Sequence, residues 1–175
     1  MTRLELEHII RAAASISGDD QIVVLGSQAI LGQFPQAPAT LRRSMKADVY
    51  PLNLPERWDL IDGSIGEGSM FHETCGYYAQ GVEERTATLP TGWQARLIPI
   101  CNANTRGATG LALEVHDLLI AKTVAGRPKD IAFLAEAARH GLADGAVLLA
   151  RLQQTALPEA IEASAQAHIR RAFGV

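Results

Sequence analysis

The chain has 175 residues, of which 47% are hydrophobic, and a formal net charge of −3 at pH 7. This length suits one domain, or a small domain with a helical extension, and the hydrophobic content excludes a disordered chain. The negative net charge excludes a globally basic nucleic-acid binder.

Neither the cysteines nor the apolar runs indicate a metal-stabilised or membrane protein. Cys75 and Cys101 do not have the spacing of a zinc site, and we expect reduced thiols. The start of the chain, MTRLELEHII, lacks the apolar core of a signal peptide, and no stretch reaches the ~20 apolar residues of a membrane helix. These patterns predict a soluble, cytoplasmic protein.

The first elements are an amphipathic helix, a strand and a second helix. Apolar residues at helical spacing predict a helix over residues 3–16. The β-branched run QIVVLG, residues 21–26, predicts a buried strand. SQAILGQF, residues 27–34, then predicts a helix with Ser27 near its N-cap, which the following prolines end.

The middle of the chain continues the alternation. KADVYPL, residues 46–52, predicts a second strand, and residues 55–66 predict a helix with a proline in its first turn. Aromatic and β-branched runs separated by Gly and Pro predict a β-rich region over residues 70–101. Within it, Pro99 indicates an edge strand or a bulge.

From Glu114 onward the pattern is helical and contains four helical segments. The first ends at Gly126, and the second begins with a proline and ends at Gly141. We therefore predict an α+β fold, with a mixed-sheet core over residues 1–110 and a C-terminal helical region over residues 111–175 packed on it.

Gly26 and Ser27 form the first candidate for a functional site. They join a predicted strand to a predicted helix, where glycine would let the backbone approach a phosphate and Ser27 would offer a hydroxyl and an N–H. The helix dipole would add partial positive charge. The same pair of residues is also common as an ordinary turn and helix cap.

Asp48, in the next predicted strand, is the second candidate. Nucleotide transfer needs Mg²⁺, and Mg²⁺ needs carboxylate oxygens held on rigid backbone beside the phosphates. Residues two apart on a strand share a face, so Lys46, Asp48 and Tyr50 point together. Such a set can bind a phosphate but binds a metal poorly, and Asp48 is its only candidate metal ligand. Alternatively, Asp48 forms a surface salt bridge with Lys46 or Arg43.

The third candidate is HDLLIAKTVAGRPKD, residues 116–130. Five charged side chains surround the break between two predicted helices: Asp117, Lys122, Arg127, Lys129 and Asp130. Three cations with two orienting acids could form a phosphate clamp. The alternative is a solvated pair of helices with ordinary contacts between residues three and four apart.

GSQAILG, SMKADVY and HDLLIAKTVAGRPKD, in this order, resemble the nucleotidyltransferase superfamily. More narrowly, they resemble the AbiEii-like nucleotidyltransferases and the related DUF6036-type bacterial proteins. The resemblance covers roughly residues 21–140 and implies a nucleotidyltransferase-like mixed sheet with flanking helices, followed by a helical region. It also implies transfer of a nucleotide from an NTP, with Mg²⁺, to an RNA or protein acceptor. Several members are toxins of toxin–antitoxin pairs.

Carried over by position, the resemblance implies roles for particular residues. Gly26 and Ser27 would hold the triphosphate, and Asp48 would bind the metal. Lys122 would contact phosphate or the acceptor, and Asp130 would orient it or assist proton transfer. The remaining residues that we predict to bind the nucleotide are Lys46, Tyr50, Arg127 and Lys129.

Tyr50 stands where the active family pattern has a second metal-binding acid. We therefore expect Mg²⁺ to be held weakly when no nucleotide is bound. Three interpretations stay open: an active nucleotidyltransferase, a non-catalytic nucleotide- or RNA-binding member, and a partner-binding protein such as one half of a toxin–antitoxin complex with its cognate antitoxin.

Overall fold

The structure, a computed structural model, describes all 175 residues, and the chain divides into two compact units. Unit 1 comprises residues 1–86 and 97–113, and unit 2 comprises residues 87–96 and 114–175. Each unit has its own packed elements. The segment 87–96, which the sequence places inside the core, groups with the C-terminal helices.

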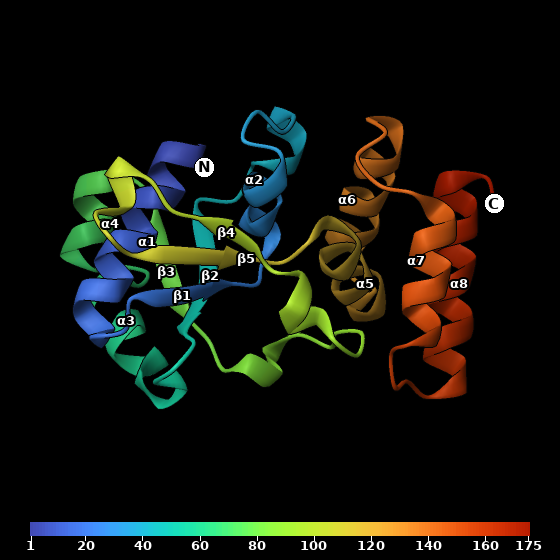
Figure 1. Cartoon of the computed structure of the whole chain (residues 1–175). Coiled ribbons are helices and arrows are strands. Elements are labelled where there is room, and N and C mark those ends of the chain that lie inside the picture. Colours follow the sequence, from blue (N-terminus) through green and yellow to red (C-terminus); the bar gives the residue numbers. More distant parts are fainter. The chain divides into compact units, whose positions relative to one another are not determined.

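Unit 1 is built on a five-stranded mixed sheet. Its strands are β1 (Gln21–Val24), β2 (Lys46–Pro51), β3 (Tyr78–Gly81), β4 (Ile98–Ile100) and β5 (Thr109–Ala112). They lie in the order β3-β2-β1-β5-β4 (Figure 1). β1 is central, antiparallel to β2 and parallel to β5, while β2 is parallel to β3 and β4 is antiparallel to β5.

The helices of unit 1 are α1 (Arg3–Ser17), α2 (Ile30–Gln33), α3 (Trp58–Ile65) and α4 (Met70–Cys75). α1 begins at a capping box of Thr2 and Glu5 and ends at Gly18 in the left-handed conformation. α1 and α3 pack against each other and against the sheet (Figure 1). Glycines of the sheet allow this close packing, because a Cβ on Gly110 would lie 3.0 Å from Cγ1 of Ile10 on α1.

The strand register places the candidate residues on the sheet face opposite to α3. Gly81 lies directly under α3, where an added Cβ would be 2.9 Å from the carbonyl carbon of Trp58. Val49 pairs with Gly81, so Asp48, its neighbour on β2, points to the other face together with its own register partner Gln80.

The α+β fold predicted from the sequence is confirmed, and so are the strands β1 and β2 and the edge position of β4, which contains Pro99. The prediction of a β-rich region over residues 70–101 is wrong in part. Its first residues form α4, because the Ser69 hydroxyl accepts the N–H of His72 at the helix start and left-handed Gly76 ends the helix.

The helix predicted over residues 27–34 is shorter than expected. A 3-10 turn, η1 (Ser27–Ala29), is followed by the single turn of α2. Gly26, and not Ser27, is the N-cap residue of η1, and no side chain caps it. So short a helix carries little dipole, because the macrodipole requires several aligned turns.

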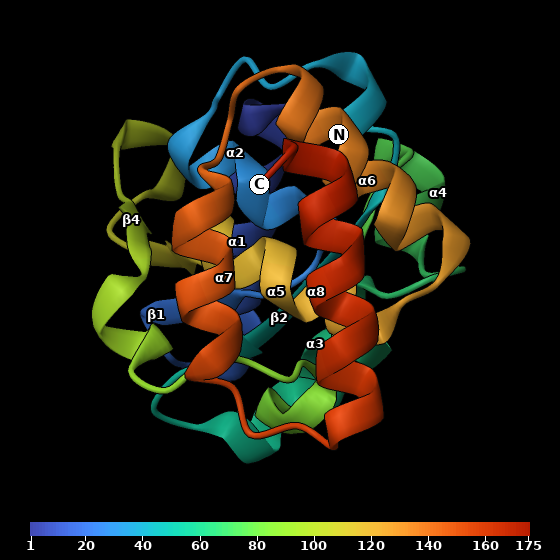
Figure 2. The same cartoon turned by 90° about the vertical axis from the view of Figure 1, so that its right-hand side faces the viewer.

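Unit 2 consists of the segment 87–96 and four helices, which pack together (Figure 2). The helices are α5 (Val115–Ala125), α6 (Pro128–Arg139), α7 (Gly145–Gln153) and α8 (Glu159–Phe173). The predicted ends are confirmed at Gly126, which is left-handed, and at Pro128, the first residue of α6. In neither unit is any helix both long and apolar enough to cross a bilayer.

Candidate functional site

The turn after β1 lies directly against Asp48 of β2. The N–H of Leu25 donates to the carbonyl of Asp48 at 2.9 Å, which fixes the end of β1 to β2. At the next residue, Gly26, an added Cβ would lie 2.9 Å from Cγ of Asp48 and closer still to Oδ2. Only glycine leaves room for the turn and this carboxylate together.

The turn presents hydrogen-bond donors. The first intrahelical bond of η1 runs from Ala29 N–H to Gly26 O at 2.9 Å, so the N–H groups of Ser27 and Gln28 have no intrahelical partner. Gly26 and Ser27 are half-buried. These N–H groups and the Ser27 hydroxyl can bind an anion without help from a helix dipole.

Two buried acceptors beside the turn lack a hydrogen-bond donor: Oε1 of Gln28 and Oδ1 of Asp48. Gln28 is fully buried, and its amide nitrogen donates to the carbonyl of Ser44 at 3.1 Å, which orients Oε1 as an acceptor. η1 and β2, which carry these two residues, pack together. Buried polar atoms almost always have a partner. A cation or a donor group of a ligand would satisfy these two oxygens, but contact would require the buried Oε1 of Gln28 to become exposed.

Lys46 lies beside Asp48, as the strand alternation predicts. Its Nζ is 3.0 Å from Oδ1 of Asp48, an ion pair without the alignment of a hydrogen bond, and it donates to Oε1 of Gln80 on β3. The salt bridge that the alternative interpretation expected is therefore present with Lys46. Gln80 was missed because the pairing of β2 with β3 cannot be read from the sequence.

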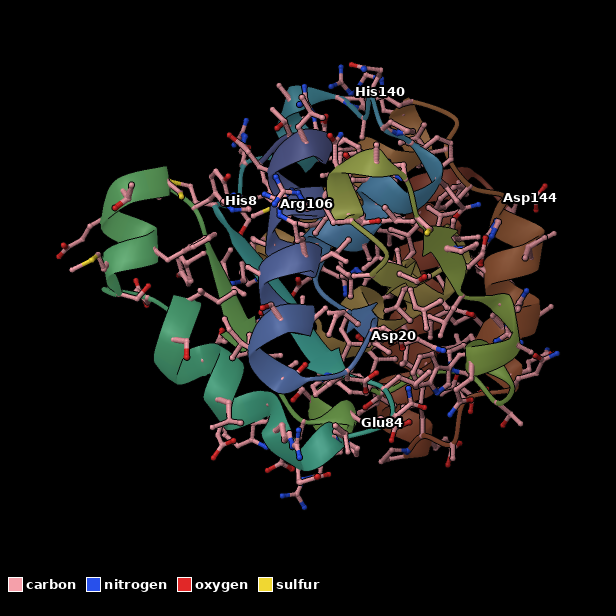
Figure 3. All side chains as sticks on the ribbon, turned by 60° about the vertical axis from the view of Figure 1, so that its left-hand side comes forward. His8, Asp20, Glu84, Arg106, His140 and Asp144 are labelled. Carbon is pink, nitrogen blue, oxygen red and sulfur yellow. The ribbon has the colours of Figure 1, made fainter.

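Tyr50, the third residue of this β2 face, is 2% exposed. Burial raises the pKa of its phenol well above the usual range, and the negative charge of Glu84 (labelled in Figure 3) raises it further. Tyr50 is therefore neutral. The predicted contact with a nucleotide would require this side chain to become exposed.

In unit 2, Asp130 is the centre of an ion-pair cluster. It is 1% exposed, with Oδ1 3.3 Å from Nζ of Lys122 and Oδ2 2.5 Å from Nε of Arg127. The Lys122 ammonium also lies over the ring of Phe133, 4.6 Å from its centroid. Burial alone would raise the pKa of Asp130, but the hydrogen bonds and charges of the two cations hold it below its usual range.

The five charged residues predicted as one clamp divide into separate groups. Asp117 is fully buried and accepts two hydrogen bonds from Arg96, at 2.8 and 3.1 Å, and one from Arg151 at 3.2 Å. It thus anchors the segment 87–96 to α5 and α7. Arg127 and Lys129 are exposed at the start of α6 and accessible to a ligand.

A cavity of about 440 Å³ lies elsewhere in unit 1, at the opposite end of β1 from Gly26. Arg11 of α1, Asp20 and Arg106 contribute charged side chains to its lining, and Figure 3 labels the last two. None of the site residues that we predicted from the sequence lines this cavity. The candidate site at Gly26 is an open turn beside a strand and is separate from it.

A family model described as a nucleotidyltransferase of unknown function, DUF6036, matches residues 4–173. No curated protein and no solved structure matches the chain.

Proposed function

The chain belongs to the DUF6036 family of nucleotidyltransferases, and from this premise we propose that unit 1 binds a nucleoside triphosphate at the turn formed by Gly26 and Ser27. The N–H groups of the turn and the Ser27 hydroxyl would bind the phosphates. Transfer of a nucleotide to an RNA or protein acceptor is the reaction that this binding would serve.

One observation carries the proposal. The two buried side-chain oxygens without a donor, on Gln28 and Asp48, flank the turn whose N–H groups have no intrahelical partner. N–H groups without an intrahelical partner thus lie beside two oxygens without a hydrogen-bond donor, of which Oδ1 of Asp48 is ion-paired with Lys46, on η1 and β2, which pack together. A triphosphate with its bound cation would supply the matching groups, because phosphate oxygens accept hydrogen bonds and the cation binds carboxylate and amide oxygens.

Mg²⁺ fits the site only together with the nucleotide. No group of three or more His, Cys, Asp or Glu side chains is arranged to hold a metal ion, and Asp48 is the single carboxylate on its face of β2. Its Oδ1, which lacks a donor, would be one ligand, and phosphate oxygens would have to supply others. When bound, Mg²⁺ would neutralise charge on the phosphates.

Within unit 2, the exposed cations at the start of α6 are the groups that would bind a phosphate or an acceptor. Arg127 is 60% exposed although its Nε binds Asp130, and Lys129 is exposed beside it. The more buried Lys122 and Asp130 hold α5 and α6 together. Their assignment as catalytic residues, like that of Asp48, remains part of the proposal.

The alternative is a non-catalytic member that binds a nucleotide, an RNA or a partner protein such as a cognate antitoxin. The observation that favours it is Tyr50, a buried neutral side chain where the active pattern has a second acid. A site with one carboxylate can bind a metal–nucleotide complex without positioning the two metal ions of ordinary transfer chemistry.

Titration calorimetry with each of the four NTPs and Mg²⁺ tests the binding proposal. We expect one NTP to bind to the wild-type protein and Ser27→Ala to weaken that binding, whereas Ser64→Ala, on the exposed surface of α3, should leave it unchanged. Absence of binding for all four would contradict the proposal. Incubation of the protein and total RNA with α-labelled NTP then separates transfer, which labels a macromolecule, from binding alone.

A further inference from the structure

We propose that Lys46 is an internal counter-ion that neutralises Asp48 in the nucleotide-free protein and moves to the phosphates when a metal–nucleotide complex binds. The inference rests on the proposed function, because it describes how the same site distinguishes a free metal ion from one that arrives with its nucleotide. It assigns to Lys46 and Gln80 positioning roles that the family match does not contain.

The geometry places a positive charge where a metal ion would bind. Nζ of Lys46 is 3.0 Å from Oδ1 of Asp48, the carboxylate oxygen that has no hydrogen-bond donor. A metal ion on this oxygen would be only a few ångströms from the ammonium, and the two positive charges would repel each other. The pair is also neutral overall, so it does not attract a free divalent cation.

Gln80 holds the ammonium in this position. The register pairs Gln80 with Asp48, and its Oε1 accepts a hydrogen bond from Nζ of Lys46. Lys46 is therefore bound by one charged and one neutral acceptor. The neutral amide positions the ammonium without adding a second negative charge that would compete with a phosphate for it.

The side chain of Lys46 can move its ammonium group away from Asp48. Its side chain is 36% exposed and carries the charge on a flexible stem, whereas Asp48 is 25% exposed and lies against Gly26. A triphosphate at the turn would offer the ammonium several negative oxygens. Once Lys46 moves to them, Oδ1 of Asp48 is released for the metal ion that the nucleotide brings.

The test measures binding of Mn²⁺ alone, by titration followed with electron paramagnetic resonance, to nucleotide-free protein. Lys46→Met should bind Mn²⁺ at least about tenfold more tightly than wild type, because the repelling charge is gone. Lys46→Arg, which keeps the charge, should bind as weakly as wild type. Arg43→Met removes the same charge from an exposed residue of the same segment and should also leave Mn²⁺ binding weak.

Two further measurements complete the design. Adding Asp48→Asn to Lys46→Met should abolish the gained Mn²⁺ affinity, and circular dichroism should show that Lys46→Met is folded. In EDTA, Lys46→Met should bind NTP more weakly than wild type, because the phosphates lose a cation. Equal Mn²⁺ affinity of wild type and folded Lys46→Met would overturn the inference, as would a gain that survives Asp48→Asn.

The outcomes separate this inference from the proposed function. If wild type binds Mg²⁺–NTP but Lys46→Met gains no Mn²⁺ affinity, the proposed function stands and the counter-ion role of Lys46 fails. If Lys46→Met gains Mn²⁺ affinity but no NTP binds to any variant, Lys46 does neutralise Asp48, while the proposed function and the movement to phosphate both fail.

Discussion

Nε2 of His116 accepts a hydrogen bond from the backbone N–H of Asp144, with a nitrogen–nitrogen distance of 3.0 Å. The bond joins the first turn of α5 to the N-cap residue of α7 (Asp144 is labelled in Figure 3). Nδ1 of the same ring lies 2.7 Å from Oε1 of Glu114. Since Nε2 accepts, the neutral ring must carry its proton on Nδ1 and donate it to Glu114.

This relationship predicts the tautomer of His116. A two-dimensional ¹H–¹⁵N correlation spectrum of the imidazole rings at alkaline pH should show His116 protonated at Nδ1 and unprotonated at Nε2. His168, on α8, has no such pair of partners and serves as the reference for an unconstrained ring. Protonation of His116 at Nε2 would show that the bond from Asp144 does not form.

Gly26→Ala should weaken both the fold of unit 1 and its binding of NTP. The added Cβ would lie 2.9 Å from Cγ of Asp48, and such overpacking typically costs about 1–3 kcal/mol. Gly63→Ala is the control, because Gly63 lies in α3 with nothing within 4 Å of the added atom. It should stabilise the protein by about 0.5–1 kcal/mol. Urea unfolding measures the first effect and calorimetry the second. Unchanged stability of Gly26→Ala would refute the tight contact with Asp48, and unchanged NTP affinity would contradict binding at this turn.

Asp130→Asn should destabilise unit 2. The change leaves the ammonium of Lys122, 11% exposed, without its carboxylate, and breaking a buried ion pair in this way costs about 3–5 kcal/mol. Glu136→Gln removes a carboxylate from the same helix, where its partner Arg139 is well exposed, and should change stability little. Thermal unfolding measures both variants. A small effect of Asp130→Asn would mean that Lys122 finds water or another acceptor.

Asp19 should make stability depend on pH in the acid range. It is 4% exposed and accepts the N–H groups of Gln21, Asn53 and Leu54 at 3.0, 2.6 and 3.1 Å. Burial alone would raise its pKa, but these bonds lower it below the unfolded value. The folded state therefore binds fewer protons, and the stabilisation, present above about pH 4, is lost as pH falls through the folded pKa.

The comparison of Asp19→Asn with wild type tests this direction of the pH dependence of stability. At pH 7 the variant should be less stable than the wild type by about 1–3 kcal/mol. This difference in stability should disappear as the pH is lowered below about 4. Asp20→Asn, at the exposed neighbour, is the control and should change stability little at either pH. A difference that is independent of pH would assign the effect of Asp19 to packing.

Tyr50→Asp should not restore a metal site. Tyr50 is 2% exposed and close enough to Glu84 to be affected by its charge, so a new carboxylate would be buried beside another negative charge at a cost of several kcal/mol, about 3 or more. Tyr50→Phe keeps the volume and should cost about 1 kcal/mol or less. Chemical denaturation measures the stability of both variants. A stable Tyr50→Asp variant that binds Mn²⁺ would show that the side chain at position 50 can become exposed.

Local signals in the sequence predicted most helices and the central strands. The apolar spacing of α1 and the glycine after α5 are signals that involve only residues close in sequence. α4 was mistaken for a strand because its aromatic residue outweighed the Ser69 cap and Gly76. The strand propensity of individual residues is a weak signal for a segment of only six residues.

The candidate site was predicted as far as it lies along one strand or one turn. The pairing of Lys46 with Asp48 follows from strand alternation, and Gly26 beside Asp48 follows from the order of the elements. Gln80 comes from β3, whose register against β2 depends on contacts distant in sequence. Arg96, the partner of Asp117, was missed for the same reason.

The division of the chain has a consequence for inheritance. The backbone passes between the two units at residues 86–87, 96–97 and 113–114, so no single cut separates them. A gene fragment that encodes only residues 114–175 would lack Arg96 and leave the buried Asp117 with one of its two arginine partners. When one recombination event joins these C-terminal helices to the first part of another gene, Asp117 keeps both arginine partners only if that gene also encodes an arginine at position 96.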